Sequence, residues 1–133
     1  MYSVSLHIEI DAPAVKVFEA LTRQELLSKW FAPQVIAVPV EGTVAAFAFE
    51  FDLNFKMEIV ALQQNKQLRW ICVDGYEAWL DSEIVFKLEE KALTTSLDFS
   101  HSKLINDDKK EKTVKSWSGY LEKLKELCES TIK

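Results

Sequence analysis

The middle of the chain, from Val35 to Ser102, alternates apolar and polar residues with a period of two. Such alternation is typical of strands with one buried face. Short polar connections of hairpin length interrupt it at residues 41–42, 52–54, 63–66 and 89–91. We therefore predict six strands that pair antiparallel as a meander. They lie at about Val35–Val40, Thr43–Phe51, Phe55–Leu62, Gln67–Val73, Asp81–Glu89 and Ala92–His101.

The segment before this region predicts one more strand and two short helices. Residues 2–10 alternate in the same way and form a first strand. Asp11 or Ala12 should cap a first helix, with Pro13 in its first turn. The pair Thr22 and Glu25 fits a capping box and predicts a second helix, which Pro33 ends.

The C-terminal segment, from about Asp108 to Ile132, predicts one long amphipathic helix. Its apolar residues form one stripe, with two more at its edge: Val114, Trp117, Leu121, Leu124 and Cys128, then Tyr120 and Leu127. Gly119 falls on the solvent side. We expect a single α+β domain over residues 1–133. In it the sheet curls around the long helix, the first strand pairs with the last, and the two short helices close an open end.

Composition excludes several classes of function. The net charge of −5 argues against nucleic-acid binding, which needs clustered Lys and Arg. The N-terminus lacks the features of a signal peptide, and the longest apolar run is too short to enter a membrane. Cys72 and Cys128 form no spaced motif, so we expect buried free thiols in a reducing cytoplasm. The oligomeric state stays open.

Four segments resemble a known family in order and approximate spacing: APAVKVFEALT, LLSKWFAP, TTSLDFSHS and KSWSGYLEKLKE. The chain is similar to the START-like (SRPBCC) superfamily, in the branch named after the activator of the heat-shock protein 90 ATPase. The resemblance covers nearly the whole chain. It implies the helix-grip fold, in which a curved sheet and the C-terminal helix enclose an elongated cavity.

The chain departs from the usual pattern of that family in two places. Glycines common near the third strand and the following turn are reduced to Gly42, with Asp52-Leu53-Asn54 in the turn. After His101, Ser102-Lys103-Leu104 stands where a glycine-aromatic step is usual. Both positions border the cavity mouth in the family, so the identity of a ligand is not transferred.

The two histidines lead to different expectations. His7 lies on the polar face of the first strand and should be solvated. His101 ends the apolar face of its strand, so it is either a strand-end imidazole bonded to backbone or water, or a group that looks into the cavity mouth.

No other set of residues predicts catalysis. Histidines and cysteines sit on separate elements without paired spacing, so neither a metal nor another cofactor is expected. Ser100 and Ser102 point away from His101, and no two carboxylates can be placed facing one substrate.

Aromatic residues are the strongest candidates for a binding site. If the cavity of the family fold exists here, some rings should line it rather than fill the core. The predicted ligand-binding residues are Trp30, Phe49, Trp70, Phe99, His101, Trp117 and Tyr120. Trp30 and Phe31 should cap one end of the cavity. Tyr76 and Trp79, in the loop 74–80, either form a lid or fold back on the sheet.

Three functions remain open. The first is non-catalytic binding of a small, mainly apolar molecule in the cavity, in a protein linked to the stress response by its family. The second is a chaperone-activator-like protein-interaction module. The third is a cyclase- or hydrolase-like enzyme that uses His101 or Tyr120. A chaperone pulldown would favour the second, and turnover that His101→Ala abolishes would favour the third.

Overall fold

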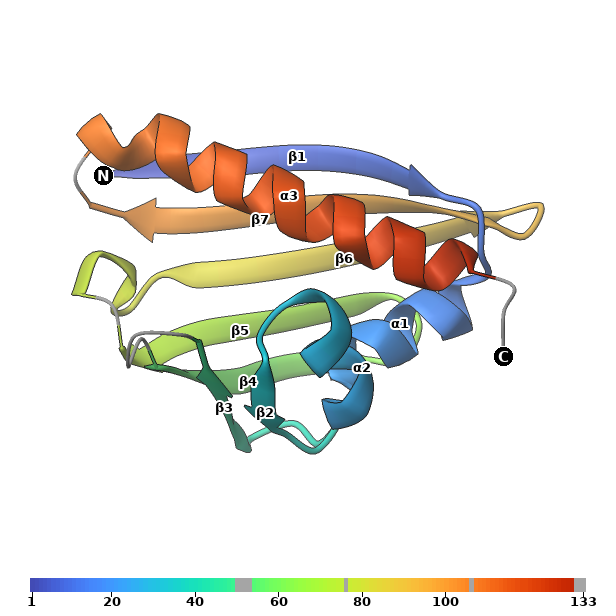
Figure 1. Ribbon diagram of the computed structural model, residues 1–133, viewed down its shortest axis with the longest axis horizontal. Coiled ribbons are helices and arrows are strands. Elements are labelled where there is room, and N and C mark those ends of the chain that lie inside the picture. The colour runs from blue at the N-terminus through green and yellow to red at the C-terminus, as the bar shows by residue number, and fades with distance from the viewer. Residues whose placement is uncertain (50–53, 76, 106, 131–133) are drawn as a thin grey trace.

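The computed structural model describes residues 1–49, 54–75, 77–105 and 107–130 (Figure 1). The elements follow the expected order. They are β1 (Tyr2–Ile10), α1 (Ala14–Thr22), α2 (Gln24–Trp30), β2 (Gln34–Ile36), β3 (Val44–Ala48), β4 (Asn54–Gln63), β5 (Gln67–Asp74), the 3-10 helix η1 (Glu77–Trp79), β6 (Glu83–Lys91), β7 (Thr94–Leu104), the 3-10 helix η2 (Asp107–Lys109) and α3 (Lys110–Glu129).

Over the described residues, the sheet has seven antiparallel strands, with β1 and β2 as its two edge strands. Its order is β1-β7-β6-β5-β4-β3-β2. Strand β1 pairs with β7, for example Leu6 with Phe99 and Ile8 with Leu97. This confirms the predicted pairing of the first strand with the last and the helix-grip architecture.

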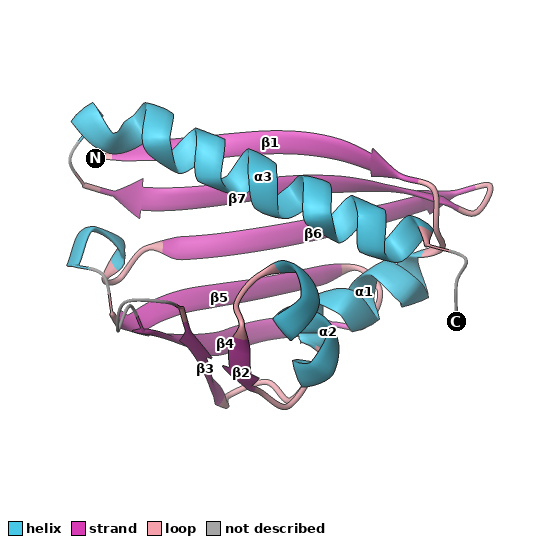
Figure 2. Cartoon of the chain, viewed as in Figure 1, coloured by secondary structure: helices cyan, strands magenta, loops and turns pink. Residues whose placement is uncertain are grey.

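The helices lie on one face of this sheet. Figures 1 and 2 show α3 running across β1, β7 and β6, with α1 and α2 beside its C-terminal half. The alternation predicted for β7 is observed, since Leu97, Phe99 and His101 are buried toward the helices while Asp98 is exposed. On α3 the predicted stripe faces the sheet, with Trp117 and Leu124 fully buried.

Two predicted helix starts are wrong. The residue at the N-cap of α1 is Pro13, and the first helical N–H, that of Ala14, donates to Glu90 Oε1 at 2.7 Å. A carboxylate from β6 therefore replaces a local cap. Thr22 belongs to α1, where its hydroxyl donates to the carbonyl of Phe18 at 2.8 Å. Because this bond occupies the hydroxyl, no capping box forms, and Arg23 precedes α2 without a side-chain cap.

Two strand boundaries also differ from the prediction. The first predicted strand of the meander, Val35–Val40, is only Gln34–Ile36, because the N–H of Ala37 donates to Gln24 Oε1 and Pro39 has no N–H for a ladder. The predicted turn at 89–91 lies inside β6, and the chain reverses instead at Ala92 and Leu93, with φ of 52° and 68°. The predicted strand end at residues 50–51 lies outside the described residues.

Candidate functional site

A stack of three aromatic rings occupies the space between the sheet and α3. Trp117 of α3 lies parallel to Phe31 on one side, with ring centroids 5.5 Å apart, and to Trp79 on the other, at 5.9 Å. Phe31 follows α2, and Trp79 ends η1. Rings from three separate elements therefore meet at one point, with Trp117 fully buried at its centre.

Rings from the sheet pack around this stack. Phe99 approaches Trp117 to 4.4 Å between centroids, and Phe47 and Trp70 approach Phe31 to 5.0 and 5.9 Å. Phe86 contacts Trp70 edge-on at 5.3 Å. Separations of this size are those of rings in direct contact. Side chains therefore fill this part of the interior.

His101 lies in the same core and is fully buried. The Trp117 indole Nε1–H donates to His101 Nδ1 at 3.0 Å. The imidazole is therefore the tautomer protonated at Nε2, which donates to Ser82 Oγ at 2.8 Å. Ser82 in turn donates to the backbone carbonyl of Trp79 at 2.5 Å. The network ties α3, β7 and the segment after η1 together, and it leaves both imidazole nitrogens occupied.

Burial determines the charge of His101. Desolvation lowers its pKa from 6.5 to about 3, so the imidazole is neutral at physiological pH. A neutral ring with both nitrogens bonded is poorly placed to act as a general base. Of the two predicted alternatives, the structure favours the bonded strand-end imidazole, although its partners are side chains rather than backbone or water.

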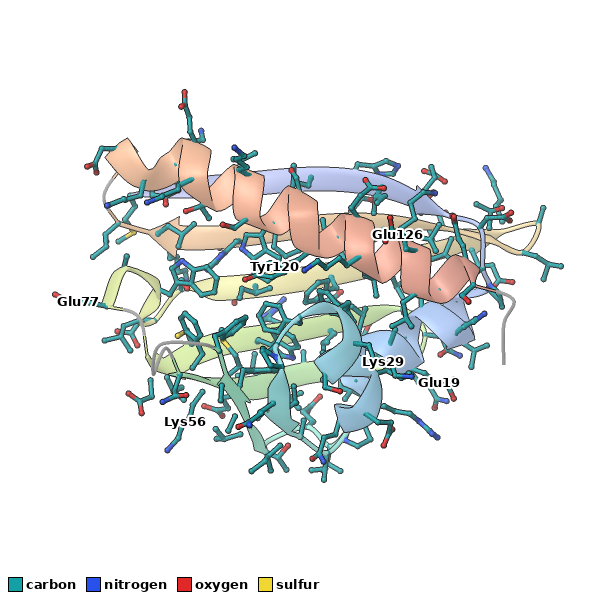
Figure 3. The ribbon with its side chains drawn as sticks, viewed as in Figure 1. Glu19, Lys29, Lys56, Glu77, Tyr120 and Glu126 are labelled. Atoms are coloured by element: carbon teal, nitrogen blue, oxygen red, sulfur yellow. The ribbon has the colours of Figure 1, made fainter. Side chains whose placement is uncertain are left out.

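The seven predicted site residues form one connected group. Trp30, Trp70, Phe99, His101 and Trp117 are buried, and Phe49 and Tyr120 are half-buried. Phe31 links most of them, with Tyr120 at 5.2 Å and Phe49 at 5.4 Å. Figure 3 shows Tyr120 pointing from the middle of α3 toward the interior. A ligand-binding role for the seven stays a prediction.

The site also contains residues that were not among the seven, which are Phe31, Phe47, Trp79, Ser82 and Phe86. Phe31 lies at the centre of the ring cluster, whereas the sequence predicts that it caps one end of the cavity together with Trp30. Trp79 folds inward onto His101, at 4.7 Å between ring centroids, which selects the folded-back alternative for this residue. Tyr76 lies outside the described residues. Ser82 follows a polar turn, and nothing in the sequence distinguishes it from a solvated serine.

Two hollows lie at the surface of the part of the chain that the structure describes. One of about 320 Å³ lies over the sheet edge formed by β2, β3 and β4. Another of about 560 Å³ lies where α1, α2 and the end of α3 meet, with Lys16 and Lys29 beside Leu127. Neither of these two hollows is lined by any of the seven predicted residues.

The opposite face of the sheet carries a small charged cluster. His7 Nδ1 lies 2.7 Å from Asp98 Oδ1, and His7 Nε2 lies 2.5 Å from Glu9 Oε2. Ser96 donates to both oxygens of Glu9. The hydrogen bonds that the protonated imidazole donates to Asp98 and Glu9 raise the pKa of His7. His7 is exposed, as predicted, but it is paired rather than only solvated.

The remaining reactive groups are isolated. Both cysteines are free and buried, and desolvation raises the pKa of Cys72 to about 11 and that of Cys128 to about 12. Such thiols are poor nucleophiles. Within residues 1–49, 54–75, 77–105 and 107–130, no group of three or more His, Cys, Asp or Glu could hold a metal ion. Over the same residues, no helix is long and apolar enough to cross a membrane.

Solved structures similar to this one come from several bacteria. The Aha1 dimer from Colwellia psychrerythraea is 27% identical, with a TM-score of 0.87 and 97% of both chains covered. Protein MLL2253 from Mesorhizobium loti is 23% identical, with a TM-score of 0.84 over 99% of this chain and 100% of that one. CalU16 from Micromonospora echinospora is 24% identical, with a TM-score of 0.76 over 94% of this chain and 73% of that one.

The family assignment rests on a match to almost the whole chain. No curated protein matches the sequence. The family model described as activator of Hsp90 ATPase homolog 1-like protein matches residues 11–129, from the start of the first helix to the end of the last. The chain therefore belongs to the family of activator of Hsp90 ATPase homolog 1-like proteins.

Proposed function

We propose that this protein is a non-catalytic protein-interaction module whose partner is an ATPase chaperone of the Hsp90 type. The observation that carries the proposal is the packed interior. The parallel rings of Phe31, Trp117 and Trp79 occupy the space in which the family fold would hold a ligand. With that space filled, the outer surface is left as the part of the molecule available for recognition.

The state of His101 supports a role without catalysis. The imidazole is neutral, buried and bonded at both nitrogens, to Trp117 and Ser82. The family description names the chaperone ATPase as the class of partner. A docking domain of this kind would change the rate of another protein's reaction without supplying a reacting group of its own.

We also propose that the protein works as a homodimer. The Colwellia psychrerythraea protein, 27% identical over 97% of this chain, is a dimer. Dimers with two-fold symmetry are the commonest oligomers of soluble proteins.

The proposal is tested with the Hsp90-type chaperone of the same organism. Steady-state ATP hydrolysis is measured with increasing amounts of the purified protein, after subtraction of the rate that a chaperone inhibitor leaves. We expect complex formation in analytical ultracentrifugation and a saturable change in the ATPase rate. If concentrations of about 100 µM give neither a complex nor a change in rate, the interaction-module proposal is wrong.

A second candidate function is binding of a small, mainly apolar molecule at the ring cluster. The half-buried rings of Phe49 and Tyr120 favour it, since they lead from the surface to Phe31. Burial raises the pKa of Tyr120, so its hydroxyl stays protonated and can donate to a ligand. Entry would require these two rings to move apart.

This candidate is tested with an environment-sensitive apolar dye. If the site opens, the dye binds the wild type, Tyr120→Ala weakens binding, and Val15→Ala on the exposed side of α1 leaves it unchanged. Trp117→Ala is measured for stability and affinity together, because its loss from the core costs about 3–5 kcal/mol. If the folded fraction of Trp117→Ala binds the dye as tightly as the wild type does, Trp117 serves only the stability of the core. Absence of dye binding to the wild type would exclude this candidate.

A further inference from the structure

Exposed aliphatic side chains gather where β2 leads into β3. Ile36 is 73% exposed, Val38 52%, Val40 53% and Val44 51%. All four lie between residues 36 and 44, and we call this segment the β2–β3 corner. Single exposed apolar residues are ordinary, but a contiguous group marks a surface that contacts another molecule.

A groove lies beside this corner on the outer face of the sheet. Its floor is formed by Ala46 and Ala48 of β3, and its volume is about 320 Å³. Ile36 pairs with Ala46 in the ladder, and Ala46 pairs with Lys56 on the other side. Because two alanines stand between longer neighbours, β3 forms the bottom of the groove and Ile36 forms one wall.

The opposite wall carries charges of both signs. Lys56 of β4 and Asp74 of β5 are cross-strand neighbours that both line the groove. Figure 3 shows Lys56 at this edge of the sheet, away from the helices. The surface therefore combines an apolar ridge, an apolar groove, one cation and one anion.

Contact through this surface would occur by side-chain packing rather than by strand addition. Strand β2 has three residues, Gln34–Ile36, and Pro33 and Pro39 bracket it. Prolines beside a short edge strand prevent the ladder from extending. The N–H of Ala37, just after β2, already donates to Gln24 Oε1 at 3.0 Å.

We infer that the occupant of this surface is a second copy of the chain, an inference that rests on the proposed self-association. A two-fold interface needs one patch that is complementary to itself. The β2–β3 corner and its groove meet this condition, because Ile36 of one copy can enter the groove over Ala46 of the other. Lys56 and Asp74 lie on the same row of the sheet, two and three strands away from Ile36, so the rim of each copy offers the other both a cation and an anion.

The first test is sedimentation equilibrium of the full chain between about 1 and 500 µM. The wild type should show a species of twice 15.3 kDa. Ile36→Glu should weaken dimerisation by at least about a hundredfold, because each dimer would then bury two unpaired carboxylates. The control Val15→Glu places the same charge on an exposed valine of α1, and its dimer should match the wild type.

The second test exchanges the charges at the rim. Lys56→Asp alone and Asp74→Lys alone should each weaken self-association, since the rim of each copy would then carry two charges of the same sign and repel the other copy. A mixture of these two variants should recover the dimer as a heterodimer, because an acidic rim then faces a basic one. Recovery in the mixture distinguishes pairing between copies from a loss of stability within one copy.

Each result decides the inference. A wild type that stays monomeric at about 500 µM overturns it together with the proposed homodimer. A dimer that survives Ile36→Glu overturns this surface and leaves the homodimer standing. If Ile36→Glu is shown by circular dichroism to be unfolded, Ala46→Gln replaces it, since it fills the groove from its floor and should also give monomer. A monomeric wild type whose complex with the chaperone is lost in Ile36→Glu assigns the surface to the chaperone instead.

Discussion

At the scale of single residues, His101 stands out because it is polar and fully buried in an aromatic core. A buried polar group costs free energy unless it is hydrogen-bonded. Here Trp117 and Ser82 occupy its two nitrogens, and Ser82 donates its own proton to a backbone carbonyl. All the hydrogen bonds of this network form only while the imidazole is neutral. Protonation of His101 therefore favours the unfolded state.

We therefore predict that His101 makes the protein acid-sensitive. Its pKa of about 3 in the folded state lies below the value of 6.5 for a free imidazole, so the unfolded state binds a proton between these values and the folded state does not. The stabilisation that neutral His101 contributes to the folded state is fully present above pH 6.5 and is lost as the pH falls toward 3. Between pH 7 and 4.5 the loss is about 2–3 kcal/mol.

The measurement is urea unfolding at both pH values. His101→Gln should be less stable at pH 7, but the difference in its stability between the two pH values should be smaller by that amount. A variant with the same pH dependence as the wild type would contradict the prediction.

His7 should respond to pH in the opposite sense. Hydrogen bonds that its imidazole donates to Asp98 and Glu9 raise its pKa, so the folded state holds the proton more tightly than the unfolded state. Its contribution to stability is present below pH 6.5 and is lost as the pH rises through its folded pKa. A proton NMR titration should place the midpoint of His7 above 6.5. Asp98→Asn should bring it closer to 6.5, and a midpoint at or below that value in the wild type would contradict the assignment.

The sequence predicts which face a residue lies on, but not its partners. Counting by twos along β7 places His101 on the apolar face and Asp98 on the polar face, and both are observed there. Ser82 and Trp117 could not be predicted as partners of His101, because the pairing depends on how β6, β7 and α3 come together. Periodicity predicts the face of the sheet to which a side chain points, but not which side chains of other elements lie within bonding distance.

At the scale of elements, the hairpin between β6 and β7 shows where sequence patterns fail. Its two turn residues, Ala92 and Leu93, both have positive φ, a conformation that normally selects Asn or Gly. Because positions 92 and 93 hold neither Asn nor Gly, the polar run at 89–91 resembles a turn more closely in sequence than Ala92-Leu93 does. The strands on either side hold the turn in place through the pairs Lys91–Thr94 and Glu90–Thr95.

Replacing Ala92-Leu93 by Asn-Gly should therefore stabilise the protein. Each non-glycine residue with positive φ costs about 1 kcal/mol, so the double variant should gain about 1–2 kcal/mol in the free energy of unfolding. Leu93 is 67% exposed, so little packing is lost. Leu93→Ala keeps the β-carbon and should show no such gain. A double variant no more stable than the wild type in denaturant unfolding would refute this interpretation of the turn.

Two glycines should respond to alanine in opposite directions. Gly119 lies within α3, and a β-carbon added there would meet no atom within 4 Å, so Gly119→Ala should stabilise by about 0.5–1 kcal/mol. Gly75 has φ of 128°, and a β-carbon there would lie 2.5 Å from the carbonyl oxygen of Asn54. Gly75→Ala should therefore destabilise by more than about 1 kcal/mol. Thermal unfolding of the two variants side by side checks both signs.

At the scale of the whole molecule, the order of the elements and the pairing of β1 with β7 could be predicted, because hairpin-length connections permit few topologies. The state of the interior could not. Apolar spacing on Trp30, Trp117 and Tyr120 shows that these rings face inward, and it is equally compatible with a lined cavity and a filled core. Only the centroid separations, such as 4.4 Å between Phe99 and Trp117, distinguish the two.

The continuous core predicts a single cooperative unfolding transition. The buried cluster includes residues from β1, both short helices, the sheet and α3, so no part can leave without exposing the rest. Tryptophan fluorescence and far-ultraviolet circular dichroism should give the same midpoint and width on heating. Two separated transitions would contradict the prediction of one domain over residues 1–133.

The pairing of β1 with β7 has a consequence for how the protein is made. A ribosome releases the chain from the N-terminus, so β1 emerges before its partner β7, which ends at Leu104, and before α3, which begins at Lys110. Until β7 and α3 have been synthesised, the edge of β1 that pairs with β7 stays open and its apolar residues lack their cover. The newborn chain must therefore keep β1 from pairing elsewhere until both of these elements have emerged.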